Sequence, residues 1–268
     1  MMRVTISAVA AMGLLAIGTS ALAQKVYPTK AFYENTRYAL PPQDGHAFSA
    51  DGKKLLISSD KTGVVNVYVL PVAGGAPTPL TTSSSNATFA TSWFPKDDRI
   101  LFTADQGGNE LNHLYVRGLD GQVKDLTPGE KLKAQFAGWN TAGTTFYVTT
   151  NERDPKAFDL YAYDATTYAR KLVFRNTGAF SPGDLSGDGR WLALVKQHSS
   201  ANSDLYLADL SQGDTAEPKL ITPHQGAVAF GAYEFTPDNT ALVYSTDEPG
   251  EFTEAWRYDV KTGAKTRL

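Results

Sequence analysis

The stretch Phe48-Ser49-Ala50-Asp51-Gly52 opens a phrase that the chain repeats five times. In each copy an aromatic residue or a leucine is followed by a short polar turn, an apolar strand, a polar loop, an aromatic-centred strand, a second turn and a closing leucine. The other four copies open at Phe94, Trp139, Leu185 and Phe235, with spacings of 46, 45, 46 and 50 residues. A repeat of this length that carries four short strands is typical of a β-propeller blade.

Two further positions keep the same period. The aromatic residue of the third strand recurs at Tyr68, Tyr115, Tyr161, Tyr206 and Trp256, and the closing leucine recurs at Leu80, Leu126, Leu172, Leu220 and Leu268. The alternative, a β-sandwich with coincidental spacing, does not account for three marks with one period. We therefore predict an all-β fold, a β-propeller of four-stranded blades with five blades present, over about 43–82, 88–128, 134–175, 180–223 and 229–268.

The turns and the apolar strands support this fold. Asp51-Gly52 and Asp188-Gly189 are strong hairpin signals, because a tight turn needs residues that tolerate positive φ. A four-stranded sheet that is apolar on both faces must be covered by its neighbours. The side chains expected to fill the spaces between blades are Leu55, Ile57, Leu101, Phe146, Val148, Leu192, Leu194, Leu242 and Tyr244.

The N-terminus has a different character from the repeats. Residues 1–23 combine an early Arg3, a short apolar run and Ala21-Leu22-Ala23, which is the pattern of a signal peptide cleaved after Ala23. We expect an N-terminal extension over 24–42, with a short helix around 30–35, and no membrane span in the mature chain. The sequence has no cysteine, which suits a periplasmic or secreted bacterial protein that does not depend on disulfides.

The repeat resembles the PD40-type propeller repeat of TolB and of the serine peptidases of the prolyl oligopeptidase family. Three loop phrases, Gln106–Tyr115, Thr150–Tyr161 and Thr246–Asp259, are similar to those of dipeptidyl-peptidase and acylaminoacyl-peptidase relatives. The resemblance covers residues 26–268. It implies a propeller that precedes a C-terminal α/β-hydrolase domain, which holds the Ser, Asp and His of catalysis.

We expect that hydrolase domain to be missing from this chain. A nucleophile elbow needs Gly-x-Ser-x-Gly, and the nearest string, Gly183–Gly187, has the wrong spacing. We therefore expect no catalytic residue in this chain, although the resemblance is to enzymes. We expect instead that the propeller gates and docks short peptide substrates. Peptidase propellers of this group usually have seven or eight blades, so five would be part of a larger propeller. The alternative is a stand-alone TolB-like periplasmic propeller that binds another protein.

Acidic residues gather in the loops between the second and third strands. A ring of negative charge at one end of a propeller would attract a free peptide amine. By resemblance to peptidases that grip the substrate amine, the candidate substrate-binding residues are Glu152, Arg153, Glu248 and Glu251. The alternatives are a solvated rim for the carboxylates and, for Arg153, a local ion pair with its neighbours Glu152 or Asp154.

Other ligand classes find little support in the sequence. Asp184 and Asp188 lack the oxygen spacing of a calcium loop, and no Cys/His cluster suggests zinc. The net charge is −3 and the basic residues are scattered, which gives no footprint for nucleic acid. We expect no metal and no cofactor.

Overall fold

The computed structural model describes residues 26–268, and the chain divides into two compact units, Met1–Asn35 and Thr36–Leu268. The predicted signal peptide, residues 1–23, lies outside the described residues. The described part of the first unit contains a single helical turn, α1 (Lys30–Tyr33), where the sequence predicted a short helix.

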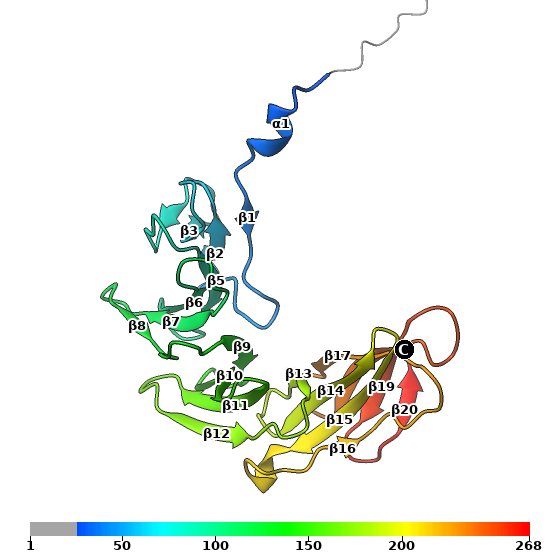
Figure 1. Ribbon diagram of the computed structural model, residues 1–268. Helices are drawn as coiled ribbons and strands as arrows, with labels where there is room; N and C mark the ends of the chain where they lie inside the picture. Colours follow the sequence, from blue (N-terminus) through cyan, green and yellow to red (C-terminus); the bar gives the residue numbers. More distant parts are fainter. Residues whose placement is uncertain (1–25) are drawn as a thin grey trace, which may run out of the picture. The chain divides into compact units, whose positions relative to one another are not determined.

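The second unit consists of five antiparallel four-stranded sheets, each formed by four strands that are consecutive in the sequence (Figure 1). This confirms the predicted fold class of four-stranded blades. The first three sheets contain β1 (Tyr38–Ala39), β2 (Lys54–Ser59), β3 (Asn66–Pro71) and β4 (Thr78–Pro79); β5 (Thr88–Trp93), β6 (Ile100–Ala104), β7 (His113–Arg117) and β8 (Val123–Asp125); and β9 (Ala134–Trp139), β10 (Thr145–Asp154), β11 (Ala157–Asp164) and β12 (Arg170–Phe174). The last two contain β13 (Ser181–Leu185), β14 (Trp191–Ser199), β15 (Asn202–Asp209) and β16 (Lys219–Leu220); and β17 (Phe230–Phe235), β18 (Ala241–Thr246), β19 (Glu254–Asp259) and β20 (Lys265–Arg267), with a 3-10 turn, η1 (Leu210–Gln212), before β16.

The first strand of the first sheet differs from the sequence-based prediction. Strand β1 lies before residue 43, where the first repeat was expected to start. It has only two residues, and these pair with Ser59 and Ser58 of β2. A strand this short shows no period-two pattern, so only its partner in the folded chain defines it.

One hydrogen-bonded turn explains the opening phrase of the repeat. The Ser49 hydroxyl donates to Asp51 Oδ1 (2.7 Å) and accepts from the backbone N–H of Lys54 (3.0 Å), while Gly52 takes φ = 69°. The hydrogen bonds that the Asp51 carboxylate accepts from the Ser49 hydroxyl and from the backbone N–H of Lys53 hold the pKa of Asp51 below its usual range. Ser186 and Asp188 repeat the arrangement at 2.5 Å in the fourth sheet. Side chains therefore fix these turns locally.

Threonines that follow the closing leucine of three repeats have a structural role. The hydroxyls of Thr81, Thr127 and Thr222 each accept a backbone N–H from the third strand of their own sheet, at 2.8, 2.9 and 2.8 Å. Each threonine thereby extends the pairing of a very short fourth strand. The threonine near the end of each of these repeats thus ties the outermost strand to the third strand of its blade.

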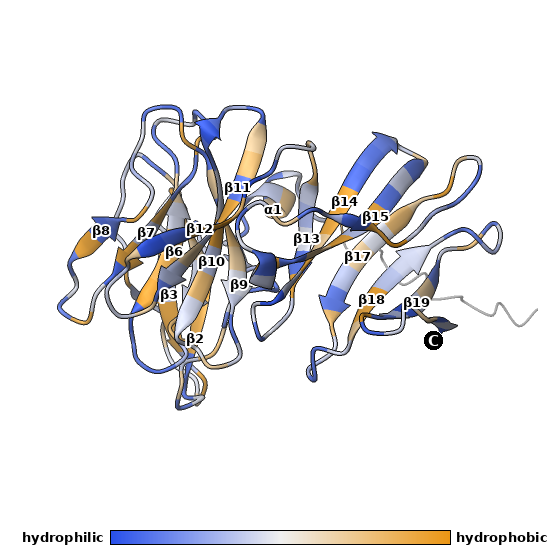
Figure 2. Cartoon of the chain, turned by 90° about the horizontal axis from the view of Figure 1, so that it is seen from below, coloured by the Kyte–Doolittle hydropathy of each residue, from blue (hydrophilic) through white to orange (hydrophobic). Residues whose placement is uncertain are grey.

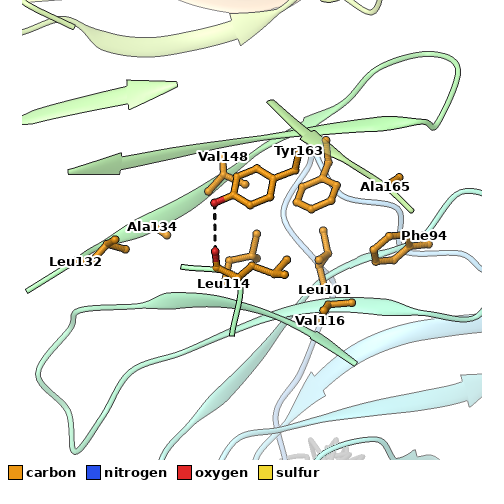
Figure 3. Packing of buried hydrophobic residues seen from close by; sticks show 11 residues of the cluster. Phe94, Leu101, Leu114, Val116, Leu132, Ala134, Val148, Tyr163 and Ala165 are labelled. Atoms are coloured by element: carbon orange, nitrogen blue, oxygen red, sulfur yellow. Dashed lines mark hydrogen bonds between the residues drawn. The ribbon is translucent and has the colours of Figure 1, made fainter. Parts of the chain in front are cut away.

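The hydrophobic core is divided among the interfaces between successive sheets. Four clusters join the first sheet to the second, the second to the third, the third to the fourth and the fourth to the fifth. Apolar segments lie within the middle strands, such as β10 and β18 (Figure 2). At the second interface, Leu101 packs in one cluster with Val148 and Tyr163, whose hydroxyl donates to the Leu126 carbonyl at 3.3 Å (Figure 3).

The first sheet agrees only in part with the predicted core. Ile57 is buried as predicted, but the side chain in the cluster shared with the second sheet is the fully buried Leu56 rather than Leu55 or Ile57. Neighbouring residues of a strand face opposite sides of the sheet, so the two sets of side chains cannot share one interface. The other predicted core residues, from Leu101 to Tyr244, belong to the clusters.

Candidate functional site

Arg153 lies at the end of β10 and forms part of the framework of its blade. Its Nε donates to Asp159 Oδ2 (2.5 Å), and its Nη2 donates to Asp159 Oδ1 (2.8 Å) and to the Asn176 carbonyl (3.0 Å). The Asp159 side chain is fully buried, and it also accepts the backbone N–H of Asn176 (2.8 Å). The expected ion pair therefore exists, but its partner is Asp159 rather than a sequence neighbour.

Glu152, the adjacent candidate, points to the outer part of the same blade. Its Oε2 accepts from Arg170 Nη1 at 2.6 Å, and Arg170 belongs to the outermost strand, β12. The Arg170 guanidinium carbon also lies 5.1 Å from the centre of the Tyr161 ring. Burial, together with a hydrogen bond to Glu152, raises the pKa of Tyr161. Glu152 thus has two partners in its own sheet.

Glu248 and Glu251 lie in the loop between β18 and β19, and both are exposed. The backbone N–H of Glu248 donates to the Thr246 hydroxyl at 3.0 Å. Within residues 26–268, no hydrogen bond or ion pair joins either glutamate to the sheet that carries Glu152 and Arg153. The structure does not bring the four candidate residues together, and their role in substrate binding stays a prediction.

The histidines pair with carboxylates and carbonyl groups. His113 Nδ1 lies 2.8 Å from Asp125 Oδ2, and His113 Nε2 lies 2.9 Å from the Gly129 carbonyl. His198 and His224 both contact Asp204, at 2.8 and 3.3 Å. Burial lowers the pKa of His46. None of the ring contacts found in residues 26–268 is with a serine hydroxyl.

A groove follows the first strands of the blades, which are edge strands of their sheets. It consists of two adjoining cavities that share Gln135 and Phe136 of β9. The larger, about 450 Å³, lies between β1, β5 and β9. The smaller, about 160 Å³, lies between β9 and β13. We call this pair of cavities the inner groove.

Two of the strands that line the inner groove, β9 and β13, have an irregular backbone. Strand β9 is irregular between its pairs Trp139–Phe146 and Phe136–Val148, and Gly138 within it takes φ = 107°. Strand β13 has a similar irregularity between Pro182 and Leu185. Such bulges bend a strand and re-aim its side chains, and they are frequent next to binding sites.

The two parts of the inner groove carry opposite charge. Asp44 and Asp184 line the smaller cavity, and Arg37 lines the larger one. Burial raises the pKa of Asp184 to about 6, although its Oδ2 accepts the Phe235 N–H at 2.6 Å; the Asp44 and Glu234 carboxylates raise it further. Burial also raises the pKa of Asp44.

Sequence reasoning did not single out the inner groove. Asp44 and Asp184 are far apart in the sequence, and no spacing motif links them. One signal was present: an acidic residue stands directly before the repeat's opening residue in two copies, as Asp184 before Leu185 and Glu234 before Phe235. That position lies on the edge strand, and the groove follows this edge.

Neither a metal site nor a membrane helix is found in the described chain. Over residues 26–268, no three His, Asp or Glu side chains are placed to hold one ion. No helix in that range is long and apolar enough to cross a membrane.

Sheet order and the repeated turn define the chain as a β-propeller protein. No protein-family model matches it. Dipeptidyl aminopeptidase BIII of Pseudoxanthomonas mexicana is 27% identical over 248 residues, which cover 91% of this chain and 36% of that protein. The predicted resemblance to dipeptidyl peptidases is thus confirmed, and this chain spans about a third of the length of that relative.

Solved structures share the fold. TolB from Acinetobacter baumannii aligns with a TM-score of 0.53 and 21% identity, over 85% of this chain and 53% of TolB. A prolyl endopeptidase aligns with a TM-score of 0.64 and 13% identity, over 87% of this chain and 36% of the peptidase. At these identities the likeness concerns the architecture of the propeller.

Proposed function

We propose that this chain is the propeller portion of a secreted serine peptidase of the prolyl oligopeptidase type. In this role the propeller admits and docks short peptides for an α/β-hydrolase domain, and it performs no bond cleavage itself. The observation that carries the proposal is the similarity to dipeptidyl aminopeptidase BIII over 91% of the chain. The inner groove, with apolar lining and charged side chains, supports a docking role.

The genetic test is to read the open reading frame beyond the codon for Leu268. We expect further four-stranded repeats and then Gly-x-Ser-x-Gly at a strand-to-helix turn. A stop codon directly after Leu268 in the genome would contradict the proposal and favour a stand-alone propeller that binds another protein.

The biochemical test uses the purified chain. We expect it to bind short unblocked peptides in calorimetry and to leave dipeptidyl p-nitroanilides intact. A serine-inhibitor-sensitive turnover that persists through purification would contradict the non-catalytic role. Absence of binding to every short peptide would contradict the docking role.

A further inference from the structure

The inner groove has the dimensions and the lining of a ligand site. Its larger cavity, about 450 Å³, falls within the range of small-molecule pockets. Three large apolar side chains line it: Leu40 and Phe89, which are 61% and 42% exposed, and the partly buried Phe136. Exposed apolar groups in a concave site favour a ligand with an apolar side chain.

The edge of β9 can pair with an extended backbone. This strand pairs with β10 on one side only, so in its regularly paired part, which includes Gln135 and Phe136, the backbone N–H and C=O groups of every second residue face away from the sheet. Both residues line the inner groove. An extended peptide that lies along such an edge satisfies these groups as an added strand would.

The smaller cavity attracts a cation. Asp44 and Asp184 both line it, and the charged groups that act on Asp184 are the carboxylates of Asp44 and Glu234. No lysine or arginine is among the residues that line this cavity. Because burial disfavours the ionised carboxylates, a bound ammonium group would relieve an existing cost.

The larger cavity carries the opposite charge, because Arg37 lines it and does not line the smaller one. The Arg37 side chain has no hydrogen bond or ion pair among the described residues, and only its backbone N–H is engaged, with Asp60 Oδ1 at 2.8 Å. A free guanidinium is well suited to a carboxylate, which it can bind through two parallel N–H donors. The smaller cavity of the groove therefore carries the acidic side chains, and the larger cavity carries the basic side chain together with the exposed apolar ones.

We propose that the inner groove binds a short zwitterionic peptide along the edge of β9. The peptide's α-ammonium group lies at Asp44 and Asp184, an apolar side chain enters the larger cavity, and the α-carboxylate turns toward Arg37. This assignment rests on the proposed docking function, and it gives that function a site, a ligand class and an orientation.

The test compares three ligands with the full chain by calorimetry. The probes are alanyl-phenylalanyl-alanine, its N-acetyl form and its C-terminal amide. We expect the acetyl group and the amide each to weaken binding about tenfold, the effect of one lost charged hydrogen bond. Asp184→Asn should abolish the penalty for acetylation alone, and Arg37→Gln should abolish the penalty for amidation alone.

Further variants separate the site from the fold. Asp44→Asn tests the acidic side chains of the smaller cavity if Asp184→Asn fails to fold. Phe89→Ala should weaken the binding of all three probes by a similar factor. Asp214→Asn, which alters an outer-loop carboxylate paired with Arg175, should change none of the affinities. Each variant's thermal unfolding establishes that it is folded.

Two results would overturn the assignment in different ways. If peptides bind but the acetylation penalty disappears with Glu248→Gln or Glu251→Gln rather than Asp184→Asn, the inner groove is not the site and the docking function stands. If the unaltered chain binds none of the probes, both the groove assignment and the docking function fail.

Discussion

Gly189 is a residue whose identity is required by both its backbone and its surroundings. It takes φ = 74°, and a Cβ atom built on it would lie 2.1 Å from the Tyr147 hydroxyl of the preceding blade. Gly52 occupies the same place in the first repeat with φ = 69°, but no atom lies within 4 Å of its Cβ position. Substitution of Gly52 therefore measures the cost of the backbone conformation alone, whereas substitution of Gly189 adds the cost of a steric contact.

We predict that Gly189→Ala destabilises the chain more than Gly52→Ala does. Both substitutions cost about 1–2 kcal/mol for a left-handed backbone, and only Gly189→Ala adds a contact penalty of about 1–3 kcal/mol. Urea unfolding measures the difference. Tyr147→Phe should recover part of the extra loss in the double variant, and equal losses for the two alanine variants would show that the turn at Gly189 does not pack against the Tyr147 side chain.

At the level of secondary-structure elements, the β10–β11 hairpin depends on a buried carboxylate. Asp159 is fully buried beside Arg153, whereas the nearby pair of Glu152 and Arg170 has exposures of 23% and 39%. Removing one partner of a buried ion pair leaves an uncompensated charge, while an exposed pair contributes little.

We therefore expect Arg153→Ala to lower the urea midpoint clearly more than Arg170→Ala. A matched variant, Asp159→Asn with Arg153→Met, should recover stability because it removes both charges together. If Arg153→Ala unfolded at the same midpoint as Arg170→Ala, the pair of Arg153 and Asp159 would contribute no more to stability than the more exposed pair, which would contradict its role in the framework of the blade.

Some secondary-structure elements could be predicted from the sequence and others could not. The turn at Asp51-Gly52 is set by side chains within six residues, so its pattern is visible in the sequence. Strand β1 and the choice of Leu56 over its neighbours depend on partners elsewhere in the chain. The inner groove depends on them too, since it brings Asp44 next to strands that follow much later.

At the scale of the whole second unit, stability is spread over separate interfaces. Each core cluster involves two successive sheets, and no described cluster joins the first sheet to the fifth. In repeat proteins, stability is close to a sum of repeat terms and nearest-neighbour interface terms. Substitutions at different interfaces should therefore act independently.

Val148 and Ile221 provide the test, because they belong to the second-to-third and fourth-to-fifth interfaces. We predict losses of about 1.5–3 kcal/mol for Val148→Ala and about 0.5–1.5 kcal/mol for Ile221→Val, which add within about 0.5 kcal/mol in the double variant. Val148→Ala with Val116→Ala, both in one cluster, is the matched control and should depart from additivity by more than that. Urea unfolding at equilibrium provides all the free energies. Strong coupling between Val148 and Ile221 would contradict independent interfaces. It would mean that the five sheets share one cooperative core, in which a substitution at one interface changes the free energy lost at a distant one.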